Sequence, residues 1–352
     1  MPLSAPPPPR SPLDRHRQLA PSASVRVSPI CLGAMNFGEA WKERLGECSK
    51  ETAFEILDYF VSQGGNFIDT ANNYQNEESE KWIGEWIVQR QNRDEIVLAA
   101  KFSSSYKNHE AGRVQSNYGG NGSKSIRVSL DLSLQKLQTS YIDLYLNDLV
   151  VSGKVLYLGI SDCPAWVVAK ANQYARDHGL RQFSVYQGLW NASIRDFERE
   201  ILPMCRDENM GVVPWGTLAK ADSKRKAATD EEKRVAKTLE TIADAKRTNL
   251  TSIAFAYVRH KAPYVIPIVG GRTLEHLRGN IAALEVSLSV EEVAQIEAAY
   301  SFDHGFPHTF LSGSLFDGSA PRAPNGPRDV WLTKLMGNFD WVQPQLPIER
   351  NQ

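Results

Sequence analysis

Apolar residues recur along the chain in two alternating patterns. Short apolar runs typical of buried strands are separated by stretches whose apolar positions are three or four residues apart, as on one face of a helix. In residues 51–63, for example, Ala53, Leu57 and Phe60 share such a face, and Gly64 follows as a stop signal. Because strand-like and helix-like stretches alternate strictly, the pattern predicts parallel strands joined by helical crossovers.

Eight runs are predicted to be strands. This number favours a closed (β/α)8 TIM barrel of the α/β class over an open doubly wound sheet, and no GxGxxG motif follows an early strand. The predicted strands are 28–35, 66–70, 95–102, 141–146, 155–160, 183–189, 211–215 and 265–269. The predicted helices are 51–63, 78–90, 124–138, 165–178, 197–208, 233–246, 250–259, 274–283 and 289–300.

The length of 352 residues suits one barrel, usually about 250 residues, with an extension at each end. Residues 1–24 are rich in Pro, Arg and Ser and are predicted to form a disordered tail, with the barrel over 25–300. Residues 301–352 are rich in Gly, Pro and aromatic residues and are predicted to form an irregular C-terminal cap or tail.

One connection is too short for the pattern. Only eight residues, 147–154 (NDLVVSGK), separate the fourth predicted strand from the fifth. A parallel crossover needs about a dozen residues or more, because it includes a helix. The fourth crossover helix is therefore expected to be shortened or missing, a deficit of roughly 20 residues.

Composition narrows the function. Forty basic and 41 acidic residues give a net charge of −1, which argues against a nucleic-acid binder. No apolar run suits a membrane span, and the proline-rich start lacks the apolar core of a signal peptide. Four cysteines without CxxC spacing predict isolated thiols, no metal site and a cytoplasmic protein. The oligomeric state stays open.

Three polar residues lie at or just after neighbouring strand ends, where the reactive side chains of TIM barrels gather. Asp69 and Lys101 end adjacent predicted strands, and Tyr74 follows five residues after Asp69. A lysine can lower the pKa of a nearby phenol, and such a phenol can protonate a carbonyl oxygen while hydride arrives at its carbon. A solvated Asp–Lys pair beside a packed tyrosine is the alternative.

The last predicted strand and helix suggest a phosphate site. TIM barrels often bind phosphate there, at a helix N-terminus, and Thr273 suits the N-cap. Arg272 can fork onto a ribose 2′-phosphate, which favours NADP over NAD; a polar solvent face is the alternative. The candidate residues are Gly270 and Gly271, then Arg272, His276 and Asn280 on one helix face.

Several long stretches resemble the aldo-keto reductases, and within them the fungal aryl-alcohol dehydrogenase, norsolorinic acid reductase-like branch. They are SPICLGAMNFGEAW, GGNFIDTANNYQNEESEKWIGEW with EIVLAAKF, LVVSGKVLYLGISDCPAWVVAKANQYA and PIVGGRTLEHLRGNIAALEVSLSVEEVAQIE. The resemblance covers residues 22–345. It implies a TIM barrel, the cofactor NADP(H) and the interconversion of a carbonyl with an alcohol.

The resemblance also implies roles for individual residues. Tyr74 corresponds to the general acid, tuned by Lys101 and Asp69, and Asp69 also borders the cofactor. Three residues correspond to the set that holds the nicotinamide carboxamide: Ser161, Asp162 and Gln187. Much of the family has Asn where this chain has Asp162, which offers acceptors but no donor. Further cofactor contacts are expected from Pro214, Trp215, Gly216 and Lys220. Packing is the alternative for Trp215, and a solvated charge cluster is the alternative for Lys220.

The resemblance also identifies a loss. The family's catalytic His ends the fourth strand, in a stretch like HWWD, but YIDLYL here runs straight into NDLVVSGK. His109 could enter the pocket instead, although a surface position is the alternative.

Two functions follow. The first is an NADPH-dependent reductase of an aromatic ketone or aldehyde in fungal secondary metabolism, such as polyketide, aflatoxin-like biosynthesis. The alternative is a non-catalytic NADPH-binding protein or a truncated splice product. Five aromatic residues of the tail could form walls of the substrate pocket, and packing against the barrel is the equal alternative. They are Phe302, Phe306, Phe310, Phe316 and Trp331.

Overall fold

A computed structural model describes residues 7–146, 153–217, 228–300, 302–324, 326–343 and 345–347. Eight parallel strands form one sheet in the order β10-β3-β4-β5-β6-β7-β8-β9. A parallel bridge between Val212 and Val265 joins β9 to the segment before β10, so the barrel is nearly closed. The strands are β3 (Cys31–Gly33), β4 (Phe67–Asp69), β5 (Val97–Lys101), β6 (Ile142–Leu146), β7 (Val155–Ser161), β8 (Phe183–Leu189), β9 (Gly211–Trp215) and β10 (Ile268–Gly270).

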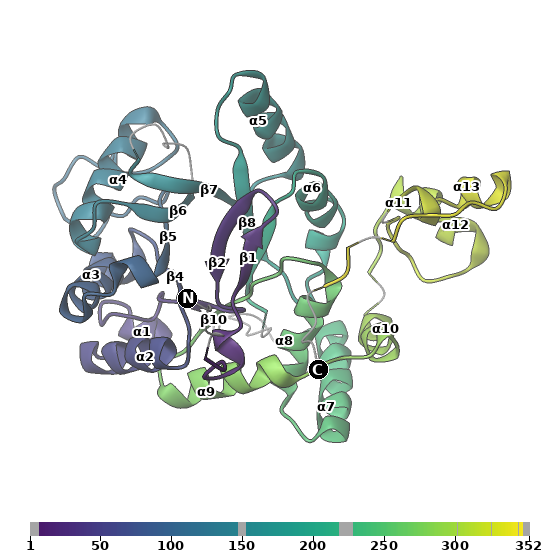
Figure 1. Ribbon diagram of the computed structural model, residues 1–352, viewed down its shortest axis with the longest axis horizontal. Coiled ribbons are helices and arrows are strands. Elements are labelled where there is room, and N and C mark those ends of the chain that lie inside the picture. The colour runs from purple at the N-terminus through teal and green to yellow at the C-terminus, as the bar shows by residue number, and fades with distance from the viewer. Residues whose placement is uncertain are drawn as a thin grey trace, which may run out of the picture.

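Helices surround this barrel (Figure 1), which confirms the predicted (β/α)8 architecture. They are α1 (Lys42–Leu45), α2 (Lys50–Ser62), α3 (Glu78–Arg90), α4 (Ser123–Leu137), α5 (Ala165–Asp177), α6 (Ile201–Asp207), α7 (Asp230–Lys246), α8 (Leu250–Lys261), α9 (Leu274–Ala282) and α10 (Val290–Ala299). Short 3₁₀ turns are η1 (Pro12–Asp14), η2 (Tyr74–Glu77), η3 (Arg93–Glu95), η4 (Asp196–Glu198), η5 (Ala283–Glu285) and η6 (Pro327–Asp329).

Alternation along the strands separates two apolar layers. Inward-facing residues such as Phe67, Ala99 and Leu144 pack together inside the barrel. Their neighbours in the strands, such as Ile68 and Leu98, pack outward against α2, α3 and α4. Both faces of the sheet are buried, which is why the strands are continuous apolar runs in the sequence.

The prediction of a disordered tail over 1–24 is wrong for the part that the structure describes. β1 (Arg17–Ala20) and β2 (Ala23–Val27) form an antiparallel hairpin. Leu13, Leu19 and Ala23 are fully buried, and Ser22 N donates to Asn209 O just before β9. The hairpin therefore closes the amino-terminal end of the barrel. The few apolar residues of this segment lack a periodic pattern, so the sequence does not show that they are buried. They are buried because they contact strands that are distant in the sequence.

We predict that Leu19→Ala destabilises the whole barrel. Leu19 is fully buried, and removing a buried leucine side chain costs about 2–5 kcal/mol. The free energy of unfolding from urea denaturation measures the loss. The matched control is Leu335→Ala, the same truncation at a residue that is 71% exposed, and it should change stability by less than about 0.5 kcal/mol. Equal stabilities for the two variants would contradict the burial of the hairpin.

β6 and β7 are parallel neighbours, with Ile142 opposite Val155. Eight residues separate the two strands. Six of them, 147–152, lie outside the described residues, so the predicted loss of the fourth crossover helix stays a prediction. Lys154, just before β7, forms an ion pair with Asp131 on α4. Leu156, on the outer face of β7, is 39% exposed, so part of the barrel wall is uncovered.

The C-terminal residues extend along the flank of the barrel. α11 (His308–Ser312), α12 (Ser314–Asp317) and α13 (Trp331–Met336) lie beyond α10 and project from the molecule (Figure 1). The rings of Phe310, Phe316 and Trp331 contact one another, and Phe310 also contacts the ring of Phe306. The Arg195 and Arg199 guanidinium groups lie over the ring of Phe302. Only Phe302 thus packs against the barrel, as one of the two alternatives has it. The other four rings pack on one another within the C-terminal segment, where Phe306 is 82% and Phe316 57% exposed.

Candidate active site

Asp69, Lys101 and Tyr74 meet at the carboxyl end of the barrel. β4 and β5 are parallel neighbours, so their terminal residues, Asp69 and Lys101, lie at one edge. Lys101 Nζ forms an ion pair with Asp69 Oδ2 and lies 5.0 Å from the centre of the Tyr74 ring. The Asp69 side chain is only 4% exposed. Its other oxygen, Oδ1, accepts a hydrogen bond from Gln187 Nε2 on β8 at 3.0 Å. The structure thus brings the three residues together.

The charges of this group differ from the sequence-based expectation. Burial raises the pKa of Tyr74, and the Lys101 ammonium only partly opposes this, so the net direction is upward. Burial alone would lower the pKa of Lys101, but Asp69 and Tyr74 favour its charged form and raise the pKa to about 12. Lys101 thus lowers the pKa of the phenol, as expected from the sequence, but burial outweighs its effect. A protonated phenol beside a permanent ammonium group is suited to donate a proton at neutral pH.

We predict that Tyr74 stays protonated to above pH 10, the ordinary phenol value. A raised pKa means that tyrosinate forms only as the pH passes that value. The ultraviolet difference titration between wild type and Tyr74→Phe measures this step. In Lys101→Met the pKa of Tyr74 should be higher still, because the ammonium group that opposes the effect of burial is gone. A difference titration with its midpoint below pH 10 would contradict the assignment.

A left-handed turn directs Tyr74 into the barrel mouth. Gln75, Asn76 and Glu77 follow it with φ values of 52°, 51° and 79°, conformations that cost about 1–3 kcal/mol each outside glycine. The contacts of Gln75, which is fully buried, offset this cost. Its amide donates to Met35 O and accepts from Trp41 N, so the 35–41 loop is held over the site.

Trp41 borders Tyr74 as a result. The two rings contact edge to face, with centroids 6.4 Å apart, and Trp41 Nε1 donates to Asn76 Oδ1. Our reading of the sequence missed Trp41, Gln75 and Asn76. The only local signal was the run of turn-forming residues around Tyr74, which does not show which distant loop the turn holds.

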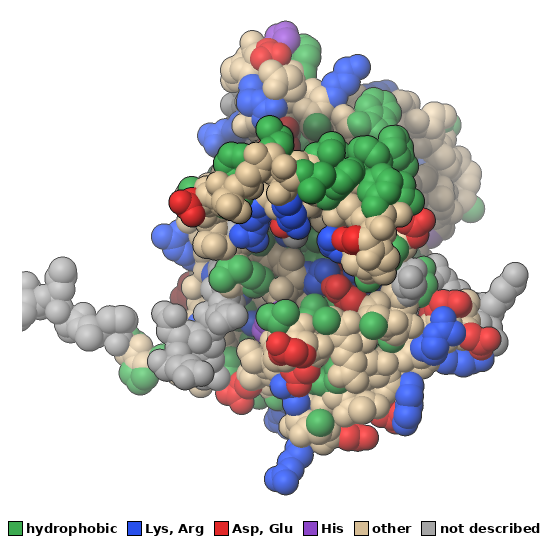
Figure 2. Space-filling model, turned by 90° about the vertical axis from the view of Figure 1, so that its right-hand side faces the viewer, with side chains coloured by type: hydrophobic (Ala, Val, Ile, Leu, Met, Phe, Trp, Pro, Cys, Tyr) green, Lys and Arg blue, Asp and Glu red, His purple; other side chains and the backbone are tan. Residues whose placement is uncertain are grey.

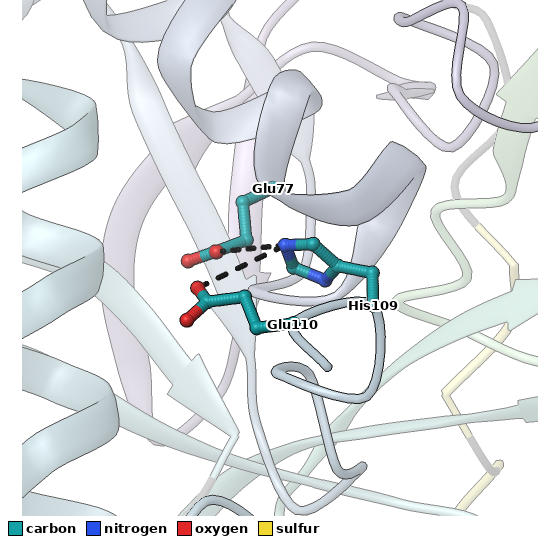
Figure 3. A group of neighbouring side chains, drawn as sticks. All are labelled: Glu77, His109 and Glu110. Atoms are coloured by element: carbon teal, nitrogen blue, oxygen red, sulfur yellow. Dashed lines mark ion pairs between the residues drawn. The ribbon is translucent and has the colours of Figure 1, made fainter. Parts of the chain in front are cut away.

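His109 lies in a cluster of charged residues with Glu77 and Glu110 (Figure 3). Its Nε2 is 3.6 Å from Glu77 Oε2 and 3.9 Å from Glu110 Oε1. These three side chains have the spacing of a metal site, but Lys107 already pairs with both carboxylates and Lys136 with Glu77. The cluster balances its charge without a cation, and these contacts engage His109 away from the pocket.

The residues predicted to hold a nicotinamide carboxamide lie around this site. Ser161 ends β7, and its hydroxyl donates to Asp162 Oδ2 at 3.2 Å. Asp162 is exposed, with φ at 49°, and its backbone N–H donates to Gln187 O. Gln187 gives one amide N–H to Asp69, so its second N–H and its carbonyl oxygen are left for a ligand. The set therefore offers an amide ligand acceptors on Asp162 and Gln187 and a donor on Gln187.

The residues predicted to bind phosphate lie where β10 leads into α9. Thr273 is the N-cap of α9, as expected, and its hydroxyl accepts from His276 N. The backbone N–H of Arg272 points to His276 Nδ1 at 3.4 Å, and a Cβ on Gly271 would lie 2.8 Å from the His276 Cβ. A capped helix start with an adjacent arginine fits a phosphate group. Asn280 lies one turn further along α9, and Gly270 ends β10.

The end of β9 carries the remaining residues that were predicted to contact the cofactor. Pro214 is buried and Trp215 is 38% exposed. Gly216 has φ at 70°, and a Cβ there would lie 2.6 Å from Leu189 Cδ1. Both the backbone conformation and the lack of space therefore exclude a side chain. Asn191 Nδ2 donates to the carbonyl oxygen of Gly216 at 3.0 Å. Lys220 lies outside the described residues.

Comparison with known proteins identifies the family. A model of the aldo/keto reductase family matches residues 29–147 and 144–301, most of the chain. This chain is an aldo/keto reductase. Norsolorinic acid reductase B of Dothistroma septosporum is 61% identical over 361 residues, covering 93% of this chain and 92% of that protein. An aryl-alcohol dehydrogenase of Pestalotiopsis microspora is 48% identical, covering 100% and 97%. An aryl-alcohol dehydrogenase [NADP(+)] of Phanerodontia chrysosporium is 43% identical, covering 93% and 96%.

The same comparisons locate the gap in this aldo/keto reductase. The family model matches in two pieces that break at 144–147, directly after β6. The alignment with the Pestalotiopsis protein spans 382 residues although this chain has 352, so about 30 of its positions have no residue here. The break in the match to the family model falls where the resemblance places the family's catalytic His.

Proposed function

We propose that this oxidoreductase reduces an aromatic ketone or aldehyde to the alcohol with NADPH, in the cytoplasm of a fungus and in secondary metabolism. The observation that carries the proposal is the buried group of Asp69, Lys101 and Tyr74 at the mouth of the barrel. The names of the relatives, norsolorinic acid reductase and aryl-alcohol dehydrogenase, support an aromatic substrate of the polyketide kind. The four thiols are free, and no helix of the described residues is long and apolar enough to cross a membrane.

Each of the three residues has a separate role in this proposal. NADPH supplies the hydride that reaches the carbonyl carbon. The Tyr74 hydroxyl gives its proton to the carbonyl oxygen, so the product is the neutral alcohol. Lys101 stabilises the tyrosinate that remains, and its charge stays fixed because its pKa is about 12. Asp69 holds the ammonium group in place and is itself held by Gln187.

Trp41 supports the choice of an aromatic substrate. Its ring lies edge to face with Tyr74. An aromatic ring beside the proton donor offers an apolar surface on which a flat ring can stack. The substrate carbonyl would then point toward the Tyr74 hydroxyl.

We predict that Tyr74→Phe abolishes the proton transfer and lowers kcat for an aryl aldehyde by about 10²–10⁴-fold. NADPH oxidation followed by absorbance measures it, and the Kd for NADPH should stay unchanged. The matched control is Tyr174→Phe, the same loss of a hydroxyl at a residue that is 58% exposed on α5. Equal rates for wild type and Tyr74→Phe would overturn the role of the phenol.

Arg272 supports NADPH over NADH. We predict that Arg272→Ala weakens NADPH binding about tenfold or more, because a charge-assisted hydrogen bond contributes about 1.5–3 kcal/mol. NADH, which lacks the 2′-phosphate, should bind the two proteins alike. Quenching of tryptophan fluorescence measures both constants. Weaker binding of both nucleotides by the same factor would show that Arg272 does not read the 2′-phosphate.

A second function is favoured by the gap after β6. The family's catalytic His also donates to the substrate carbonyl, and losing one such donor costs about 10²–10³-fold in kcat. A chain without it binds NADPH but turns over slowly or not at all, either as a non-catalytic binding protein or as the product of a truncated splice form.

Restoring the missing segment separates these functions. We predict that inserting the corresponding residues of the Dothistroma protein after Leu146 raises kcat about 10²–10³-fold while the Kd for NADPH stays the same. The control insertion carries Ala in place of the His and should restore stability alone. An insertion that leaves kcat unchanged would exclude the missing donor as the cause of slow turnover. A transcript that contains the segment would identify a splice form.

A further inference from the structure

The turn that carries Tyr74 spans residues 72–77, and few of its own contacts fix its start. The backbone N–H of Asn72 donates to Lys101 O at 3.0 Å, which joins the turn to the end of β5. The Asn72 side chain is buried, and neither Nδ2 nor Oδ1 has a hydrogen-bond partner in the described part of the chain. The turn ends at Glu77, the third residue in succession with a positive φ. Such a strained backbone persists only where the surrounding structure holds it.

Lys136 on α4 contacts both ends of this turn. Its Nζ lies 3.0 Å from Glu77 Oε1 and donates to Asn72 O at 3.4 Å. It also pairs with Glu80 Oε2 on α3 at 2.7 Å. In the sequence, Lys136 is 64 residues from Asn72 and 59 residues from Glu77. One ammonium group on a neighbouring helix therefore joins the start of the turn to its end.

This contact is buried. On the face that Figure 2 shows, Lys and Arg side chains reach the surface, many of them beside Asp or Glu. The Lys136 side chain differs, because it is only 9% exposed, and those of Glu77 and Glu80 are 5% and 0% exposed. Opposite charges attract each other more strongly in a buried site than at a surface, where water and salt screen them. The two carboxylates therefore hold the ammonium group in one place.

Close packing of α3 on α4 brings Lys136 to this place. A Cβ on Gly84 of α3 would overlap the backbone oxygen of Lys136, so a glycine is needed for the two helices to approach this closely. Gly84 lies one turn after Glu80, so the same face of α3 supplies the close approach and an acidic partner. Lys136 is in the last turn of α4, where the helix dipole also favours a cation.

We propose that Lys136 is a positioning residue for Tyr74. By holding both ends of the turn, it keeps the phenol in the barrel mouth beside Lys101. Lys107 also pairs with Glu77, but of the turn it contacts only this last residue, so it cannot replace the contact with Asn72. The inference rests on the proposed function, in which Tyr74 donates the proton, but the position of the phenol can be measured without turnover.

Lys136→Met tests the inference, because it removes the charge and keeps a long side chain. Water should then reach the phenol, so the pKa of Tyr74, which burial raises, should fall toward its ordinary value of 10. The direct loss of a positive charge would raise a phenol pKa, so a fall reports a change of position. The difference titration between Lys136→Met and the double variant Lys136→Met, Tyr74→Phe measures it.

Two further measurements follow the same variant. Hydrogen exchange of the backbone amides of residues 72–78 should become at least about tenfold faster, because the turn opens more often. The kcat for an aryl aldehyde should fall about 10–10²-fold, since a small displacement of a reacting group has such an effect, while the Kd for NADPH stays the same.

The matched control is Lys261→Met. Lys261 also joins two carboxylates, those of Glu198 and Glu297, and its side chain is 18% exposed, but it lies on α8 and its ion pairs involve no residue of the turn. This variant should lose stability in urea denaturation, as Lys136→Met does, but it should leave the Tyr74 titration, the exchange of residues 72–78 and kcat unchanged. Equal changes in both variants would show a general loss of stability and contradict the positioning role.

Glu77→Gln keeps the inference testable if Lys136→Met does not fold. It removes the charge that Lys136 holds at the end of the turn and fills the same space. Hydrogen exchange of residues 72–78 is its readout and should become faster. Unchanged exchange in each folded variant would overturn the inference. An inactive wild type whose titration and exchange respond as predicted would contradict the reductase function and still support the role of Lys136.

Discussion

The candidate site depends on the buried ion pair between Asp69 and Lys101. Two opposite charges taken out of water are stable only if they meet in good geometry and have further hydrogen bonds. The parallel pairing of β4 and β5 supplies the geometry, and Gln187 from β8 supplies the further bond to Asp69. Strands from two sides of the barrel are thus needed to hold one carboxylate. The pair in turn fixes the charge beside Tyr74.

The barrel itself could be predicted from the sequence because its strands are buried on both faces. Their apolar runs are continuous, and the strand at 183–189 and the helix at 78–90 are found with the predicted bounds. The strand predicted at 265–269 is found at Ile268–Gly270, because its earlier residues form only a single bridge to β9.

Features that depend on contacts between distant residues could not be predicted. The β1–β2 hairpin is ordered because Leu19 is buried against the barrel, and a proline-rich segment gives no sign of that. Likewise, strand ends predict that Asp69 and Lys101 are neighbours, but not that Gln187 binds Asp69 or that Gln75 holds the Trp41 loop. The direction of the Tyr74 pKa also follows from burial, which spacing alone does not give.

The gap after β6 leaves the pairing of the barrel strands in place but removes one residue that the resemblance implies for the proton chemistry. β6 and β7 pair in parallel although only eight residues connect them, because strand pairing needs only that the chain returns to the other end of the sheet. The family pattern breaks at the same place. Three of the four residues that the resemblance implies are assembled, and the fourth, the His, has no counterpart in the eight residues that follow β6.

Transfer of deuterium tests whether the assembled residues still perform the reaction. NADPH deuterated at C4 is mixed with an aryl aldehyde and the wild-type protein, and the alcohol is examined by mass spectrometry. We predict deuterium on the carbinol carbon with wild type and, after the same reaction time, about 10²–10⁴-fold less of it with Tyr74→Phe. Saturating NADPH binding with no deuterium in the product would contradict it.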